Sequence, residues 1–160
     1  MEKEKLKRIF EFLEEKENLN PPFLWKWKNN IPLIEEDLNV KGDLNLAFSK
    51  IKSFPEGLKV AGDLDLQDSY VKSLPKGLEV GGVLSLIGTY MTTLPEGLKI
   101  GGGLNVAYST ILSLPKGLEV GGDLYIHGTN LTKYTKKQLR EMVKPGFVLG
   151  RIKRIWEQNN

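Results

Sequence analysis

Hydrophobic and polar positions repeat along this chain with a fixed period of 20 residues. The pattern LPxGLxVGGxLxLxxT is clearest in Leu74–Thr89 and returns, with small changes, in Phe54–Ser69, Leu94–Ser109 and Leu114–Thr129. No insertion interrupts these four copies. A period in this range is typical of a solenoid, in which each unit buries its apolar face against its neighbours.

Five columns of apolar residues appear when the copies are aligned, and each predicts a ladder of similar side chains. The columns begin at Ile31, Leu38, Val40, Leu44 and Leu46. Residues 31–50 therefore form a degenerate first coil, and residues 131–134 begin an unfinished sixth. Two alternating segments in each coil, separated by Gly-Gly, predict two short strands. Stacking would join these strands into two parallel sheets.

Small and special residues are expected to form the bends of each coil. Glycine at the Gly-Gly corner permits positive φ and close backbone approach, and we expect Leu-Pro to fix φ at another bend. One column carries only hydroxyl side chains: Ser49, Ser69, Thr89, Ser109 and Thr129. We expect these hydroxyls to point inward and satisfy backbone groups at the turn. A catalytic serine is the rival interpretation, but no base accompanies any of the five.

Charges alternate in sign in two further columns. The residue after proline reads Glu56, Lys76, Glu96 and Lys116, and the residue after the next leucine reads Lys59, Glu79, Lys99 and Glu119. Each charge should therefore face its opposite in the adjoining coils, which stabilises by about 0.2–1 kcal/mol per pair. A slip by one coil would bring like charges together, so the alternation favours the intended register.

The string LxLxx(T/S)x(L/I)xxLPxGL over residues 31–134 resembles a leucine-rich repeat, nearest to the short class of bacterial effectors and of small phage or bacterial proteins. The resemblance implies that one strand face is the usual ligand surface. Two departures are present: Ser or Thr replaces the usual asparagine, and Gly-Leu-x-Val-Gly-Gly replaces the second Leu-Pro. Effector ubiquitin ligases of that class need a cysteine-bearing domain. This chain has no cysteine, so ligase activity is not implied.

The ends of the chain predict helical caps on one domain over 1–160: an N-terminal helical and aromatic cap over 1–30, a solenoid over 31–134 and a basic cap over 135–160. Apolar spacing predicts a helix over 2–16. Phe23, Trp25 and Trp27 either cover the first coil or form an exposed binding platform. Thr135–Gln138 has the form of a capping box, and the last segment is expected to be helical from Gly150.

Charge and composition narrow the functional classes. The net charge of +3 combines +1 over residues 1–30, −4 over residues 31–130 and +6 over residues 131–160. The absence of cysteine excludes disulfides and thiolate metal sites. Because Met1–Lys5 lacks the apolar core of a signal peptide and no run reaches membrane-spanning length, we expect a cytoplasmic protein without membrane contact.

Candidates for chemistry are few. His127 is a lone imidazole, expected at an outward position of the last coil. Gly101–Gly103 lacks the Lys-Ser/Thr and helix of a phosphate loop. Asp63, Asp65 and Asp68 do not have EF-hand spacing. We therefore expect no catalytic residue, metal, cofactor or small-molecule substrate.

The variable residues lie on and beside the second strand, and we interpret them as a protein-binding face because aromatic and acidic side chains are mixed on a regular frame. They are Asp43, Asn45, Phe48, Asp63, Asp65, Gln67, Asp68, Tyr70, Ser85, Ile87, Tyr90, Asn105, Tyr108, Asp123, Tyr125 and His127. The leading hypothesis is a non-enzymatic interaction module whose partner has a basic surface. A phage or bacterial inhibitor of a nucleic-acid-handling enzyme, of the anti-CRISPR kind, would fit by analogy.

The alternative hypothesis is direct nucleic-acid binding through the basic C-terminal cap, since phosphate contacts are made by Lys and Arg. The candidate residues are Lys133, Lys136, Lys137, Arg140, Arg151, Lys153 and Arg154. No base-reading motif accompanies them. A scaffold that polymerises end to end is a third interpretation, disfavoured by the expected caps.

Overall fold

The fold is described from a computed structural model, which places residues 3–4, 7 and 23–155. The chain divides into two compact units, Met1–Leu38 and Asn39–Asn160. The helix expected over residues 2–16 falls almost entirely outside the described residues, as does Trp156.

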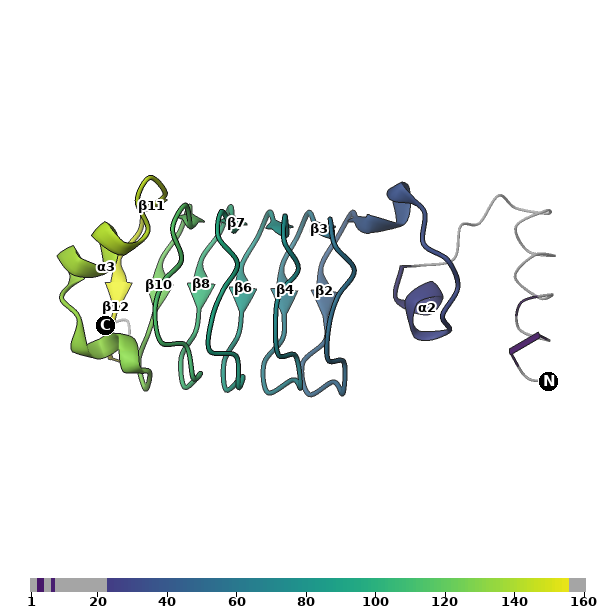
Figure 1. The fold of residues 1–160 in the computed structure, drawn as a ribbon, viewed down its shortest axis with the longest axis horizontal. Helices are drawn as coiled ribbons and strands as arrows, with labels where there is room; N and C mark the ends of the chain where they lie inside the picture. Colours follow the sequence, from purple (N-terminus) through teal and green to yellow (C-terminus); the bar gives the residue numbers. More distant parts are fainter. Residues whose placement is uncertain (1–2, 5–6, 8–22, 156–160) are drawn as a thin grey trace. The chain divides into compact units, whose positions relative to one another are not determined.

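The second unit is a β-solenoid of stacked 20-residue coils with two parallel six-stranded sheets (Figure 1). Sheet A contains β1 (Asn39–Val40), β3 (Lys59–Val60), β5 (Glu79–Val80), β7 (Lys99–Ile100), β9 (Glu119–Val120) and β11 (Phe147–Val148). Sheet B contains β2 (Leu44–Asn45), β4 (Leu64–Asp65), β6 (Leu84–Ser85), β8 (Leu104–Asn105), β10 (Leu124–Tyr125) and β12 (Ile152–Lys153). The predicted pair of short strands in each coil is confirmed.

The core consists of the predicted side-chain ladders. One ladder is at most 1% exposed and consists of Leu58, Leu78, Leu98 and Leu118. From Leu64 onward, the residues of the other apolar columns are at most 2% exposed. Parallel pairing places Leu64 beside Leu84 and Leu84 beside Leu104, so identical side chains stack. Burial of each leucine contributes roughly 1.5–3 kcal/mol. The first coil is less closed, because Leu38 and Val40 are only half-buried.

The Gly-Gly corners are required by close approach between coils. A Cβ on Gly102 would lie 2.6 Å from the carbonyl carbon of Gly82 in the preceding coil. The corners do not use the positive φ that glycine permits, and the positive-φ glycines lie at other bends. One is Gly77 (φ 74°), in the turn where the N–H of Leu78 donates to the carbonyl of Pro75 at 3.4 Å.

The column of hydroxyls points into the stack, and three of its members bond to a carbonyl of their own coil. Thr89 donates to Leu86 at 2.8 Å. Ser109 donates to Val106, and Thr129 to Ile126, both at 2.6 Å. The hydroxyls of Ser49 and Ser69 are buried without a hydrogen bond. The predicted satisfaction of turn carbonyls is therefore confirmed for three of the five.

The alternating charges stand in the predicted register on sheet A. Lys59 pairs in register with Glu79, Glu79 with Lys99, and Lys99 with Glu119. Lys59 Nζ lies 3.4 Å from Glu79 Oε2. Both side chains are about half exposed, so the pair contributes little to stability.

The C-terminal region completes a sixth coil with strands. The expectation that it is helical from Gly150 was wrong: β12 spans Ile152–Lys153, and β11 and β12 pair with β9 and β10. The sixth coil is longer than the others because η2 (Asn130–Lys133) and α3 (Lys136–Met142) precede its strands. The predicted capping box of α3 is present, with Thr135 and Gln138 bonding each other's backbone N–H.

The first unit contains a buried ion pair that sequence reasoning missed. Helix α2 (Phe23–Lys28) and the turn η1 (Glu35–Leu38) are joined by Lys26, whose Nζ lies 3.0 Å from both carboxylate oxygens of Asp37. Phe23 stacks on Trp27, with ring centroids 5.5 Å apart. Asp37 stands at the position where the other coils have glycine, and its carboxylate forms this ion pair. Helical capping at both ends of the solenoid stays a prediction.

We predict that Gly102→Ala lowers the free energy of unfolding by about 1–3 kcal/mol, because the new methyl group meets backbone atoms that cannot move aside. Urea unfolding with a constant slope provides the measurement. Gly42 holds the equivalent place in the first coil, where a Cβ meets no atom within 4 Å. Gly42→Ala should therefore be neutral or slightly stabilising. Equal destabilisation by both variants would contradict the close-approach explanation.

Candidate interaction surface

The candidate residues fall on two neighbouring parts of the solenoid. One part is the outward face of sheet B, to which Asp43, Asn45, Asp65, Ser85 and their equivalents contribute. The other is the edge that follows these strands, and it carries four exposed aromatic side chains. We call these four the aromatic edge: Phe48, Tyr70, Tyr90 and Tyr108.

One acidic column of sheet B bonds to the backbone of the next coil. Asp43 Oδ1 accepts a hydrogen bond from the N–H of Asp63 at 2.8 Å, and Asp63 Oδ1 accepts one from Val83 at 2.7 Å. Asp123 Oδ1 accepts from the N–H of Arg151 at 2.7 Å. These carboxylates continue the coil-to-coil hydrogen bonding beyond the short strands. Their presence is therefore explained by the fold, whether or not they also meet a partner.

The adjoining column is occupied by residues that stabilise their own turn. Asn45 and Asn105 each accept a hydrogen bond from the N–H two residues on, at 3.0 and 3.1 Å. Asp65 accepts the same bond from Gln67 at 3.0 Å. Asparagine and aspartate both favour this local arrangement. The negative charge of Asp65 is not needed for it, because Asn45 and Asn105 form the same bond without one.

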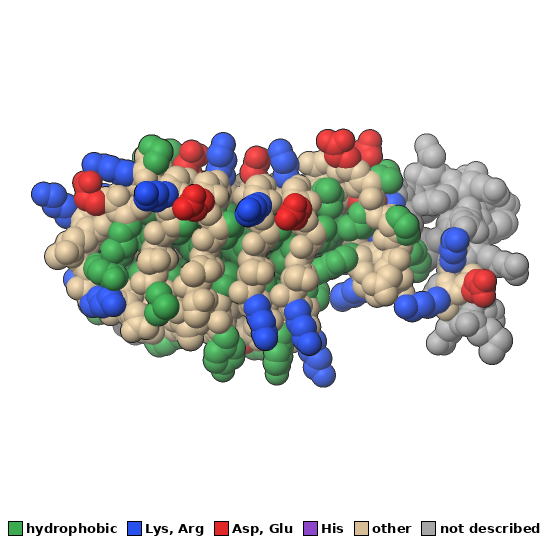
Figure 2. Space-filling view, in the orientation of Figure 1, with side chains coloured by type: hydrophobic (Ala, Val, Ile, Leu, Met, Phe, Trp, Pro, Cys, Tyr) green, Lys and Arg blue, Asp and Glu red, His purple; other side chains and the backbone are tan. Residues whose placement is uncertain are grey.

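The aromatic edge is far more exposed than its residue types favour. The exposed fraction is 81% for Tyr90, 69% for Phe48, 65% for Tyr108 and 62% for Tyr70. Tyr70 and Tyr90 occupy the same position in adjoining coils, which lie about 4.8 Å apart in a parallel sheet. Figure 2 shows hydrophobic side chains projecting from one edge of the repeat stack. This edge forms a row of apolar groups open to solvent.

Two of these aromatic residues are held in a backbone conformation that disfavours them. Phe48 has φ 58° and Tyr108 has φ 56°, whereas Gly88 and Gly128 fill the equivalent place in other coils. Positive φ is a real outlier for a bulky residue, at a cost of order 1–3 kcal/mol. The N–H of Phe48 donates to Gln67 at 2.8 Å, so hydrogen bonds between coils fix this backbone.

Basic side chains border the aromatic edge at its N-terminal end, and sequence reasoning did not include them. Lys50 fills the Tyr70 position one coil earlier, and Lys52 and Lys72 lie two residues beyond Lys50 and Tyr70. All three are exposed. A partner of this edge would meet aromatic rings and ammonium groups together, and their period-20 spacing could have signalled it.

Side chains at the C-terminal end of the predicted binding face are buried. His127, expected at the surface, is only 5% exposed, and Ala107 in the preceding coil is fully buried. The ring of Tyr108 packs edge-on against His127, with centroids 5.0 Å apart. The expectation of a surface histidine was wrong because the aromatic side chain of the preceding coil folds over it.

Three polar side chains connect β12 to β10. Lys153 Nζ lies 3.3 Å from Asp123 Oδ2 and 3.4 Å from the hydroxyl of Tyr125. The backbone N–H of Arg151 and, secondarily, the ammonium group of Lys153 lower the pKa of Asp123. The hydroxyl of Tyr125, followed by Asp123, raises the pKa of Lys153. Tyr125 and Asp123 therefore hold the last coil in place.

Several candidates for phosphate contact are engaged in the fold of the C-terminal region. Arg140 donates to the carbonyl of Gly150 at 3.0 Å, and Arg154 donates to the carbonyl of Thr132. Lys133 lies 5.0 Å above the ring of Tyr134. Lys136, Lys137 and Arg151 are exposed. The structure does not gather the seven cations into one cluster of free side chains.

Comparison with known proteins identifies no relative of this chain. No protein-family model, no curated protein and no solved structure matches the chain. Within residues 3–4, 7 and 23–155, no three His, Cys, Asp or Glu side chains group as metal ligands. Over the same described part of the chain, no helix has both the length and the apolar character needed to cross a membrane.

We predict that Asp63→Ala lowers the free energy of unfolding by about 1 kcal/mol, because the N–H of Val83 loses its acceptor. Asp63→Asn keeps an acceptor oxygen and should change stability by less than half as much. Urea unfolding of the two variants measures the difference. Equal losses would show that the charge, and not the hydrogen bond, is what the fold requires.

Proposed function

We propose that this protein is a non-enzymatic interaction module that binds a partner protein through the aromatic edge and the adjoining face of sheet B. The observation that carries the proposal is the row of four exposed aromatic side chains on a backbone fixed by hydrogen bonds between coils. Tyrosine is enriched among residues that dominate binding energy. Rings on a fixed backbone also lose little conformational freedom on binding.

The backbone strain supports the same surface. Phe48 combines positive φ with 69% exposure, so packing within the chain does not offset its conformational cost. Strained conformations of this kind cluster at functional sites. Glycine would remove the strain at this position, as it does at Gly88 and Gly128. An aromatic ring at this strained position is explained if the ring contacts a partner.

The chemistry of the surface indicates the chemistry of its partner. The carboxylates of Asp43, Asp63 and Asp65 lie on the adjoining face of sheet B, so a basic protein surface with apolar recesses would be complementary there. Proteins that handle nucleic acid present such basic surfaces. An inhibitor of an enzyme of that kind, from a phage or a bacterium, remains the specific form of the proposal. The resemblance of the repeats to leucine-rich repeats, whose strand face is the usual ligand surface, also supports it.

Binding is favoured over catalysis by the state of the hydroxyl column. A serine or threonine nucleophile needs a base within hydrogen-bond reach. Thr89, Ser109 and Thr129 are buried and donate instead to carbonyl groups of their own coils. These hydrogen bonds stabilise the turns of the coils. Nucleic-acid binding by the C-terminal region has less support, because Lys133, Arg140, Lys153 and Arg154 are held in contacts within the chain.

We predict that Tyr70→Ala combined with Tyr90→Ala weakens partner binding by at least about 30-fold, since a residue that dominates an interface contributes 2 kcal/mol or more. The partner is captured with the tagged wild-type chain from host cells and identified. It is then purified, and its affinity is measured by calorimetry. Both tyrosines are largely exposed, so the fold should be unchanged by circular dichroism.

Phe147→Ala is the matched control, because it removes an exposed aromatic ring from sheet A. It should leave the affinity for the partner unchanged. Full binding by the double tyrosine variant, or equal loss in the control, would place the partner elsewhere on the molecule.

We predict that Asp63→Asn combined with Asp65→Asn lowers affinity about 2- to 10-fold and flattens its dependence on salt, because exposed ion pairs contribute up to about 1 kcal/mol each. The amides preserve the hydrogen bonds to Val83 and Gln67. Stability should therefore be retained while charge is lost. An unchanged salt dependence would argue against a basic partner.

A further inference from the structure

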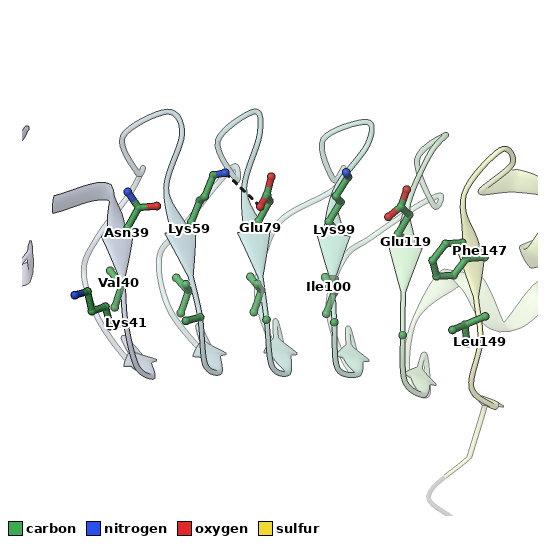
Figure 3. Close-up of a pocket in the computed structure, with 16 residues that line it drawn as sticks. Asn39, Val40, Lys41, Lys59, Glu79, Lys99, Ile100, Glu119, Phe147 and Leu149 are labelled. Carbon is green, nitrogen blue, oxygen red and sulfur yellow. Dashed lines mark ion pairs between the residues drawn. The ribbon is translucent and has the colours of Figure 1, made fainter. Parts of the chain in front are cut away.

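The outward face of sheet A is a second surface, distinct from the aromatic edge. An open groove of about 500 Å³ runs across its strands (Figure 3). One row of side chains along the groove is Asn39, Lys59, Glu79, Lys99, Glu119 and Phe147. A second row is Lys41, Ala61, Gly81, Gly101, Gly121 and Leu149. Because the middle of the second row has almost no side chains, the floor of the groove is backbone.

Two of the four charges in the first row form no ion pair with another described residue. Of this row, within the described part of the chain, only Lys59 and Glu79 form an ion pair, and both are about half exposed. Figure 3 shows the four charged side chains projecting on the same side of the sheet. Lys99 and Glu119 are available for contacts with another molecule.

The charges of this row read Lys, Glu, Lys, Glu, so the row placed against its own reverse brings opposite charges together at every position. An alternating series with an even number of members begins and ends with opposite signs, so reversal places every charge against its opposite. Reversal of the first row sets Lys59 against Glu119 and Glu79 against Lys99. The column after proline obeys the same rule, with Glu56 against Lys116 and Lys76 against Glu96. Two independent columns therefore share one centre of reversal, between β5 and β7.

We propose that two copies of this chain associate face to face through sheet A, with their stacks antiparallel. A two-fold axis parallel to the strands, passing between β5 and β7, produces this arrangement. It places β1 over the partner's β11, β3 over β9, and β5 over β7, so all six strands overlap. Such an interface is self-complementary, as a two-fold dimer requires.

The other face-to-face orientation lacks this complementarity. An axis along the stack would keep the coils in order and set the charged row over the row of Ala61, Gly81 and Gly101. The charges would then face a floor of backbone and would lose water without gaining partners. In the antiparallel arrangement, the two glycine floors face each other and let the backbones approach. At the ends, Phe147 meets Asn39, and Leu149 meets the aliphatic stem of Lys41.

The size of the face predicts a weak, reversible dimer. Six strands about 4.8 Å apart give a length of roughly 24 Å, which is small for a protein interface. Interfaces below about 1,200 Å² in total are typical of transient association. Exposed charge pairs are also screened by salt. Dimerisation should therefore be detected at high protein concentration and should weaken as ionic strength rises.

The experiment is sedimentation velocity of the full chain from low micromolar to near-millimolar concentration, at low and high salt. The wild type should shift toward twice the chain mass of 18.0 kDa as concentration rises at low salt. K99E/E119K makes the row Lys-Glu-Glu-Lys, which opposes like charges on reversal but keeps the observed Lys59–Glu79 pair. This variant should remain monomeric, with association weakened at least about 10-fold.

K59E/E119K is the matched control, with the same number of changes and the same net charge. Its row reads Glu-Glu-Lys-Lys, which still opposes unlike charges on reversal, although the stack now contains two like-charged steps. It should dimerise like the wild type. If K99E/E119K fails to fold by circular dichroism, K59E/E79K tests the same symmetry.

Three outcomes would overturn the proposal: a wild type that stays monomeric at the highest concentration in low salt, a K99E/E119K variant that dimerises normally, or a K59E/E119K control that stays monomeric. Partner capture by the aromatic edge uses a different surface. Failure of one proposal therefore leaves the other to be judged by its own variants.

Discussion

The spacing between successive coils is the constraint on which the solenoid depends. Parallel strands hold neighbouring coils about 4.8 Å apart, and the Gly-Gly corners make that spacing possible, since a Cβ on Gly102 would lie 2.6 Å from Gly82. At this distance, identical side chains such as Leu64, Leu84 and Leu104 pack directly on one another. The same distance separates neighbouring residues within every outward column, so surface side chains of adjoining coils lie one coil spacing apart.

Much of the polar chemistry on this surface serves the stack. Carboxylates at Asp43, Asp63 and Asp123 accept backbone N–H groups of the following coil. A short strand leaves such groups without a ladder partner, and an acceptor side chain supplies one. The aromatic edge differs, because its rings are exposed and two of them occupy strained backbone positions. The aromatic residues therefore indicate binding more strongly than the acidic residues do.

Sequence reasoning succeeded where one residue type repeats and failed where a single residue departs from the pattern. The Lys59–Glu79 register followed from the period alone. Asp37 departs from the glycine of the other coils, and it forms a buried ion pair with Lys26. His127 was placed at the surface by its column, yet the ring of Tyr108 covers it. The last strands were missed because η2 and α3 interrupt the period before Phe147.

The sequence by itself determined the coil, its two strands, the register of the stack and the columns that face inward. It could do so because the same local pattern recurs at a constant interval. Alignment of the copies shows which positions are apolar in every coil. Only the tertiary structure decided which outward side chains are free. Exposure of Tyr90, burial of His127 and the hydrogen bond of Asp63 each depend on what the adjoining coil places beside them. That contact joins residues 20 positions apart, so a pattern of residue types predicts their proximity but not how their side chains share the space.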